Sequence, residues 1–281
     1  MISKHQTHGV IARTSGTDRD ALPDQFADAG ALVSPGDYAR ILSQRGFGTE
    51  RVAVHIRLPF CPSRCLSCDH HTTIEHRREP IDQYLDTLEH EISLVTDRIG
   101  ARHPLAQLHL GGGSPNYLSE TQLVKLMGII ERHFTIDGST KSSLEANPRH
   151  CAPSQLQLLH GLGFGSISLQ VRDLDPLVQA AIGRTLSPAM LQDVVDNARS
   201  AGIGNVGLDL VYGLPAQTPA GMRRTLEHVL AMRPDRLMCH AFSRRPEVFR
   251  HHAALSESDL PSIADKVAMF NSLSETLTGS G

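Results

Sequence analysis

Short apolar runs alternate with amphipathic stretches along most of the chain, a pattern typical of a parallel sheet whose strands are joined by helices. Six runs have the length and composition of buried strands, at residues 51–56, 105–110, 142–146, 165–171, 205–211 and 236–242. Six strand–helix units predict an α/β fold, a partial (β/α)6 barrel rather than the closed eight-unit form. A doubly wound sheet would give the same pattern. In either fold, binding loops gather at the C-terminal ends of the strands.

Helix start and stop signals lie between these strands. Pro80 and Gly100 enclose a helix whose apolar face consists of Ile81, Leu85, Leu88, Ile92, Val95 and Ile99. Further helices are predicted to begin at Ser119, which forms a capping box with Gln122, at Ser187 and Thr218, which each precede a proline, and at Asp259. Gly202 is placed to end the helix that begins after Ser187.

The N-terminal region differs from the rest of the chain. Residues 1–33 are polar and show no period, so we expect a loose leader, followed by a short helix between Ser34 and Phe47. This divides the chain into a partly disordered extension, 1–47, and a core domain, 48–281. No apolar signal core is present near the N-terminus, and a cytoplasmic location is therefore expected.

Composition narrows the class of protein. Of the 281 residues, 40% are hydrophobic and 20% charged, as in ordinary globular enzymes. No apolar run approaches the roughly 20 residues of a membrane helix, and a net charge of -3 gives no reason to expect nucleic acid. We therefore expect a monomer that binds neither membranes nor nucleic acid. Five cysteines, three of them within eight residues, indicate a metal or cluster site in a reducing compartment rather than a disulfide framework.

The three clustered cysteines, Cys61, Cys65 and Cys68, follow the first predicted strand. Three thiolates can hold three corners of a 4Fe-4S cubane, which normally takes four cysteines, and the fourth iron is then free to chelate a small molecule. Zinc is the alternative, with His70 or His71 completing a tetrahedron, in a binding protein without enzymatic activity. Structural zinc sites usually take their ligands from two segments, whereas these cysteines lie on one loop. The spacing favours the cluster.

This loop resembles that of the radical S-adenosylmethionine (SAM) superfamily. From about Tyr38 onward the chain is similar to the oxygen-independent coproporphyrinogen III oxidase family, in residues 54–56, 59–61, 109–115, 145–149, 209–218, 234–237 and 258–261. The resemblance implies a 4Fe-4S cluster and SAM as cofactors. It also implies oxidative decarboxylation of coproporphyrinogen III propionates to protoporphyrinogen IX in haem biosynthesis, with an electron donor such as flavodoxin or ferredoxin.

The resemblance also implies roles for individual residues. Cys61, Cys65 and Cys68 would be the metal ligands, and the cofactor contacts would be His55, Ser67, Gly112, Gly113, Ser114, Glu145, Arg172, Arg184, Asp209 and Ser243. The residue types fit these roles. Glycines let the backbone approach a ligand, carboxylates accept hydrogen bonds from ribose or ammonium groups, and arginine pairs with a carboxylate. The run from Arg244 to His252 would suit substrate propionates, or is an ordinary solvated face. Cys151 and Cys239 are expected to be inert packing residues.

The chain also departs from the family. His70 stands where the family oxidase has a functional cysteine, His55 replaces a tyrosine, Arg172 replaces a glutamine, and the chain stops at Gly281 without the family's C-terminal helical domain. We therefore expect binding of cluster and SAM with little or no turnover of coproporphyrinogen III, as in a fragment or a low-activity paralog. Asp69, which follows the third cysteine, is shared with related haem chaperones, and haem transfer is a further alternative.

Overall fold

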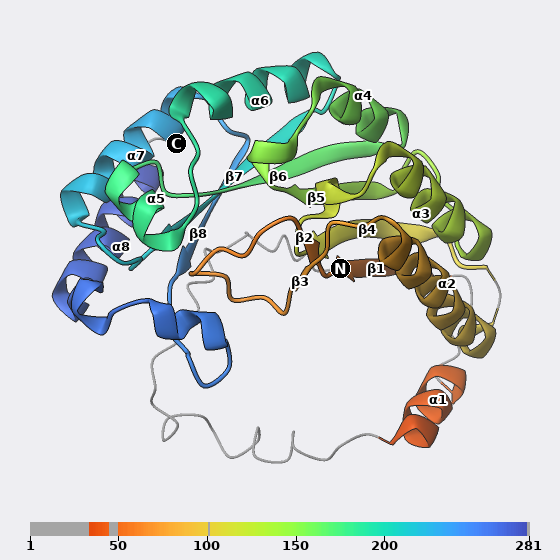
Figure 1. Cartoon of the computed structure of the whole chain (residues 1–281). Coiled ribbons are helices and arrows are strands. Elements are labelled where there is room, and N and C mark those ends of the chain that lie inside the picture. Colours follow the sequence, from red (N-terminus) through yellow and green to blue (C-terminus); the bar gives the residue numbers. More distant parts are fainter. Residues whose placement is uncertain (1–33, 45–49, 101, 280–281) are drawn as a thin grey trace, which may run out of the picture.

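The computed structural model describes residues 34–44, 50–100 and 102–279. In this part of the chain six parallel strands form one sheet, in which the strands lie side by side in chain order (Figure 1). They are β1 (Val52–Leu58), β4 (Leu105–Gly112), β5 (Lys141–Ala146), β6 (Phe164–Arg172), β7 (Asn205–Tyr212) and β8 (Arg236–Ala241). All six predicted strands are confirmed. The sheet is a partial barrel of the α/β class, open between its edge strands β1 and β8.

Helices cover the outer face of this curved sheet, apart from the most N-terminal helix, which packs against the next one and lies away from the strands (Figure 1). They are α1 (Pro35–Gln44), α2 (Glu79–Ile99), α3 (Glu120–His133), α4 (Pro153–Gly161), α5 (Pro176–Ile182), α6 (Pro188–Ser200), α7 (Pro219–Ala231) and α8 (Ile263–Gly279). Ser119, Ser187 and Thr218 each accept a hydrogen bond from a backbone N–H of the first turn, so these predicted caps are confirmed. The short helices α4 and α5 were not predicted, because their nine and seven residues give too little periodicity.

The predicted cap at Asp259 is wrong. Asp259 ends a short 3₁₀ turn, and its carbonyl accepts a hydrogen bond from the backbone N–H of Ala216 at 2.7 Å. Pro261 keeps the preceding Leu260 extended, at ψ 139°, so the helix begins only at Ile263. The hydroxyl oxygen of Ser262 is the group that accepts from the first turn.

The expected helix after Ser34 is confirmed as α1. The other predictions for the N-terminal extension, the loose leader over residues 1–33 and the boundary at residue 47, lie outside the described residues.

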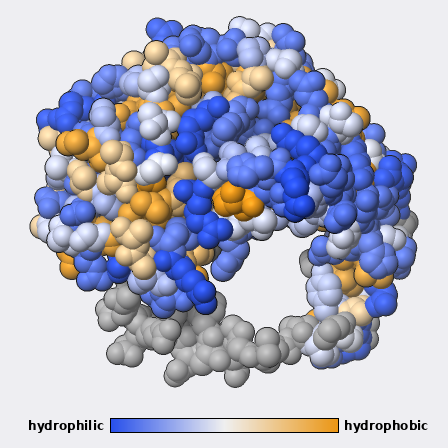
Figure 2. Space-filling model, in the orientation of Figure 1, coloured by the Kyte–Doolittle hydropathy of each residue, from blue (hydrophilic) through white to orange (hydrophobic). Residues whose placement is uncertain are grey.

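Two apolar clusters hold the fold together. The larger one lies between the sheet and its outer helices and includes Ile81, Leu85, Leu88 and Ile92 of α2, as the spacing predicts. The smaller cluster joins α5 to the ends of β7 and β8, and Leu66 of the cysteine loop packs against it. No described helix combines the length and apolar character that crossing a bilayer requires. The visible surface is mainly hydrophilic, with apolar residues in small groups (Figure 2).

The end of β4 fixes the chain that leads into the cysteine loop. Gly112 has a φ of +106°, and a Cβ added there would lie 2.9 Å from the carbonyl oxygen of Leu58. A Cβ at Gly113 would lie 2.7 Å from that of Phe60. Both glycines therefore allow a close approach to the protein's own backbone at the end of β1 and just after it. They position the loop that carries the cysteines.

Candidate functional site

Cys61 is the last residue of the short strand β2 (Phe60–Cys61), and Cys65 and Cys68 lie on the loop that joins β2 to β3 (Thr73–Ile74). Their side chains line one pocket together with Ser67, Gly112, Gly113 and Ser114. The Cys61 sulfur is 3.5 Å from the Ser114 hydroxyl. Burial raises the pKa of the Cys61 thiol, whereas for Cys68 burial is outweighed by hydrogen bonding to His70, which lowers its pKa. The sequence prediction that these residues form one site agrees with this arrangement.

Arginines dominate the rest of this pocket. Its lining includes Arg64, Arg149, Arg172 and Arg184 and no carboxylate. Arg184 is only 4% exposed, and burial lowers its pKa to about 10, so it is still cationic at neutral pH. Its Nη1 lies 3.6 Å from the Cys65 sulfur, and its Nη2 donates to Asn147 Oδ1 at 3.1 Å and to the Gln170 carbonyl at 2.5 Å.

The third guanidinium nitrogen of Arg184, Nε, is buried and has no hydrogen-bond partner among the described residues. An unpaired N–H on a buried cation carries a large desolvation cost. Such a group is suited to an anionic ligand, since an anion would supply both the missing acceptor and the opposite charge. The pocket therefore combines three thiols with a cation that lacks an acceptor.

A second cavity, of about 520 Å³, lies inside the barrel and adjoins the cysteine pocket. His55, His70, Glu145 and Asp209 line it, and Arg172 lines both spaces. Arg172 has a φ of +75° and follows a register irregularity between β6 and β7. A left-handed backbone at a residue other than glycine is strained by about 1–3 kcal/mol and occurs mainly at functional sites.

Two of the three carboxylates that line the cavity, Glu145 and Asp209, have different surroundings. Glu145 lies 3.3 Å from His109 Nε2 and accepts from the Gly112 N–H at 3.3 Å, and despite burial the His109 contact lowers its pKa. Asp209 accepts from the Ser168 hydroxyl at 2.6 Å, and burial raises its pKa. Glu145 is thus the more firmly ionised of these two, and Asp209 takes up a proton more readily.

Most of the predicted site residues come together in these two adjoining spaces. Ser243 does not: it lines a separate groove with Phe242, Lys266 and Phe270. Several lining residues were given no role from the sequence, namely His109, Asn147, Ser168, Gln170 and His240. Alternation along a strand was the available signal, because Ser168, Gln170 and Arg172 follow one another at every second position of β6.

The zinc alternative finds no matching ligand set. Among the residues that the structure describes, no three His, Cys, Asp or Glu side chains are arranged to hold one metal ion together. His70 pairs with Asp69 at 2.9 Å, and the ring of His71 lies beside that of Phe249. A cubane makes a different demand, because each thiolate binds a separate iron. The donor chemistry of the pocket therefore fits a cluster with an anionic chelating ligand beside Arg184.

Comparisons with known proteins agree with this donor set. The family model of the radical SAM superfamily matches residues 56–229. The oxygen-independent coproporphyrinogen III oxidase of Pseudomonas aeruginosa is 34% identical over 251 residues, covering 89% of this chain and 55% of the relative. The Escherichia coli oxidase is 30% identical, over 88% of this chain and 54% of the relative. The chain thus spans about half the length of these curated relatives.

The comparison of structures gives the same result. The solved structure of coproporphyrinogen III oxidase (HemN) from Escherichia coli, described as a radical SAM enzyme, matches with a TM-score of 0.82 at 30% identity, over 88% of this chain and 56% of that one. Streptococcus suis SuiB matches with a TM-score of 0.55 at 13% identity, which shows the fold alone. With a family model that covers more than half of its length, the chain belongs to the radical SAM superfamily, and this membership implies a 4Fe-4S cluster and SAM as its cofactors.

Proposed function

We propose that Cys61, Cys65 and Cys68 hold the 4Fe-4S cluster and that Arg184 receives the carboxylate of SAM beside it. The observation that carries this proposal is the buried, unpaired Nε of Arg184, whose Nη1 lies 3.6 Å from a cysteine sulfur. When bound, the two cofactors supply one-electron reductive cleavage of the SAM sulfonium. A small acidic electron carrier of the flavodoxin or ferredoxin type is the proposed source of that electron.

The chain's own residues would bind and orient SAM. Glu145 and Asp209 provide carboxylate oxygens in the barrel cavity, suited to the hydroxyl and ammonium groups of the ligand. His109 keeps Glu145 in place through its Nε2, while its Nδ1 lies 2.8 Å from the Ser143 hydroxyl. The hydrogen bond from Ser168 does the same for Asp209. These contacts keep the two acceptors preorganised before the ligand arrives.

The proposed substrate class is a propionate-bearing porphyrinogen, coproporphyrinogen III, because curated relatives at 34% and 30% identity bear the name of its oxidase. The cavity wall carries cationic side chains suited to propionates, Arg172 and Arg236 among them. His70 lies at the position where the related oxidases have a functional cysteine. Its Nδ1 pairs with the Asp69 carboxylate at 2.9 Å, and its imidazole offers no weak S–H bond. We therefore propose that the chain cleaves SAM, even if slowly, and converts coproporphyrinogen III poorly or not at all.

Anaerobic purification tests the proposal. We expect a brown protein with about four iron and four sulfide per chain, which forms 5'-deoxyadenosine from SAM when reduced by dithionite. Stoichiometric zinc in a colourless protein would overturn the cluster assignment. Protoporphyrinogen formation is then compared among the wild-type chain, His70→Cys and a full-length family oxidase. Turnover by the unmodified chain close to that of the full-length enzyme would contradict the expected loss.

A further inference from the structure

The cysteine loop reaches from one edge of the open sheet to the other. It leaves edge strand β1, and Figure 1 shows it extending toward the segment that follows edge strand β8. The backbone N–H of Leu66 donates to the Ile182 carbonyl at 2.9 Å, and the Leu66 side chain packs against the apolar cluster of α5, β7 and β8. The loop is therefore supported by parts of the chain that lie more than one hundred residues away in sequence.

Two adjacent histidines after β8 complete this support. His251 Nε2 and His252 Nε2 lie 2.6 Å and 2.9 Å from the same atom, the carbonyl oxygen of Cys68. A carbonyl oxygen only accepts hydrogen bonds, so both imidazoles carry a hydrogen on Nε2. His252 Nδ1 accepts from the backbone N–H of Arg245 at 3.0 Å, which fixes its neutral tautomer.

The rings of these histidines are held by packing. His252 is fully buried, at 0% exposure, and its ring lies 5.3 Å from that of Phe242 and 5.2 Å from that of Phe249. The His251 ring meets it edge-on at 4.9 Å. Burial also lowers the pKa of His252, in keeping with a neutral ring. The run from Arg244 to His252 is therefore not simply a solvated cationic face, because two of its members are turned inward as donors.

We propose that His251 and His252 are positioning residues for the 4Fe-4S cluster. Together they form a clasp, named here for these two residues, that ties the Cys68 peptide to the opposite edge of the sheet and so fixes the direction of the Cys68 thiolate. Contacts that orient a ligand residue govern how firmly a metal centre is retained and tune its potential. This inference rests on the cluster-binding part of the proposed function and is independent of the substrate.

The test compares anaerobic holoproteins. His251→Leu, His252→Leu and the double variant remove the donors at similar side-chain size, and His251→Gln with His252→Gln keeps them. His228→Leu is the matched control, because the exposed His228 makes a comparable contact within helix α7, with its Nδ1 2.8 Å from the Arg224 carbonyl oxygen. The rate of iron release to a chelator, the midpoint potential and the electron paramagnetic resonance spectrum of the reduced cluster are measured, together with the thermal midpoint of each protein.

We expect the double leucine variant to release iron about tenfold faster than wild type, with a changed spectrum and potential, because two hydrogen bonds of ordinary strength are lost. Each single variant gives a smaller effect, and the glutamine variant remains within about twofold of wild type. Wild-type release and spectrum in the double variant would overturn the clasp alone. The clasp would also be overturned if His228→Leu released iron as fast as the double variant. The same conclusion would follow if iron release in all variants simply increased in step with the fall in thermal midpoint. A wild-type chain that binds no cluster would overturn the proposed function as well.

Discussion

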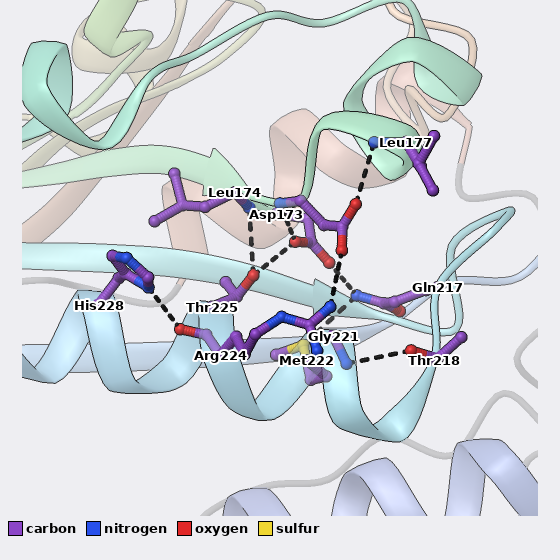
Figure 3. A network of polar contacts seen from close by, with 11 residues as sticks. Asp173, Leu174, Leu177, Gln217, Thr218, Gly221, Met222, Arg224, Thr225 and His228 are labelled. Atoms are coloured by element: carbon purple, nitrogen blue, oxygen red, sulfur yellow. Dashed lines mark hydrogen bonds and ion pairs between the residues drawn. The ribbon is translucent and has the colours of Figure 1, made fainter.

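Two polar regions meet at the end of β6, and they differ in how their polar groups are satisfied. Asp173 points into a buried network between β6 and α7, shown in Figure 3. Its carboxylate accepts from the Thr225 hydroxyl at 2.6 Å, from Gln217 Nε2 at 2.5 Å and from the Asp175 N–H at 2.8 Å. Gln217 Oε1 in turn accepts from Gly213 at 2.6 Å and Leu214 at 3.0 Å. Each of these groups finds its partner within the protein.

The neighbouring residue, Arg172, belongs to the other region. There the backbone is left-handed at Arg172, the Nε of Arg184 has no partner in the part of the chain that the structure describes, and three thiols face one pocket. A buried polar network that is satisfied internally stabilises and specifies the fold, whereas a partly satisfied one lowers stability. Exceptions of the second kind concentrate at functional sites. The difference indicates that the Asp173 network supports the loops and that the Arg172 side is completed by ligands.

The largest expected effect is the complete loss of the cluster in Cys65→Ala. The substitution removes one of three metal ligands on a single loop, so iron and sulfide should fall to background, with no 5'-deoxyadenosine formed from SAM. Cys151→Ala and Cys239→Ala are the controls, since burial raises the pKa of each of these thiols to about 12 and neither lines the pocket. Iron analysis and the visible spectrum measure the result. A full cluster in Cys65→Ala would show that Cys65 is not a cluster ligand and would contradict the assignment of this pocket to ligand binding.

The protein should lose stability when hydrogen bonds of the Asp173 network are removed. Gln217→Leu removes one of three donors to the Asp173 carboxylate and leaves the N–H groups of Gly213 and Leu214 without their acceptor, and we expect the free energy of unfolding to fall by about 3 kcal/mol. Urea denaturation measures this. Gln192→Leu on the outer side of helix α6 loses an exposed hydrogen bond to Asp196 and should change stability by less than about 0.5 kcal/mol. Equal effects of the two variants would show that the network contributes little.

In the pocket around Arg184 we expect the opposite, a loss of ligand affinity with little change in stability. Arg184→Met removes a buried cation whose Nε is unpaired, so the free energy of unfolding without ligand should change by less than about 1 kcal/mol. SAM affinity should fall by about 10- to 100-fold, as for the loss of a hydrogen bond to a charged group. Equilibrium dialysis and urea denaturation give the two values. A large loss of stability with unchanged SAM affinity would place Arg184 among the structural residues.

The sequence allowed prediction of those parts of the molecule that are determined by residues close together in the chain. The strands, three of the helix caps and the cysteine loop each have a signal within a few residues. The contacts that distinguish the two regions have no such signal. Gln217 and Asp173 are 44 residues apart, and His251 and Cys68 are 183 apart, so these pairs form only when the sheet brings distant loops together. Individual cofactor contacts such as Arg184 were assigned from family resemblance rather than from spacing.

The smallest effect is expected for the backbone of Arg172, where the two regions meet. Arg172→Gly should raise the free energy of unfolding by about 1 kcal/mol, because glycine adopts a φ of +75° without strain. Ala216→Gly is the matched control, at a φ of +61° on an exposed turn, and should stabilise by a similar amount. Of these two variants, only Arg172→Gly should also weaken SAM binding, because Arg172 lines the cysteine pocket and the barrel cavity whereas Ala216 lines neither. Loss of stability in Arg172→Gly together with a gain in Ala216→Gly would contradict this prediction. It would show that contacts of the Arg172 side chain within the protein outweigh the strain of its backbone, so that this region is satisfied internally like the Asp173 network.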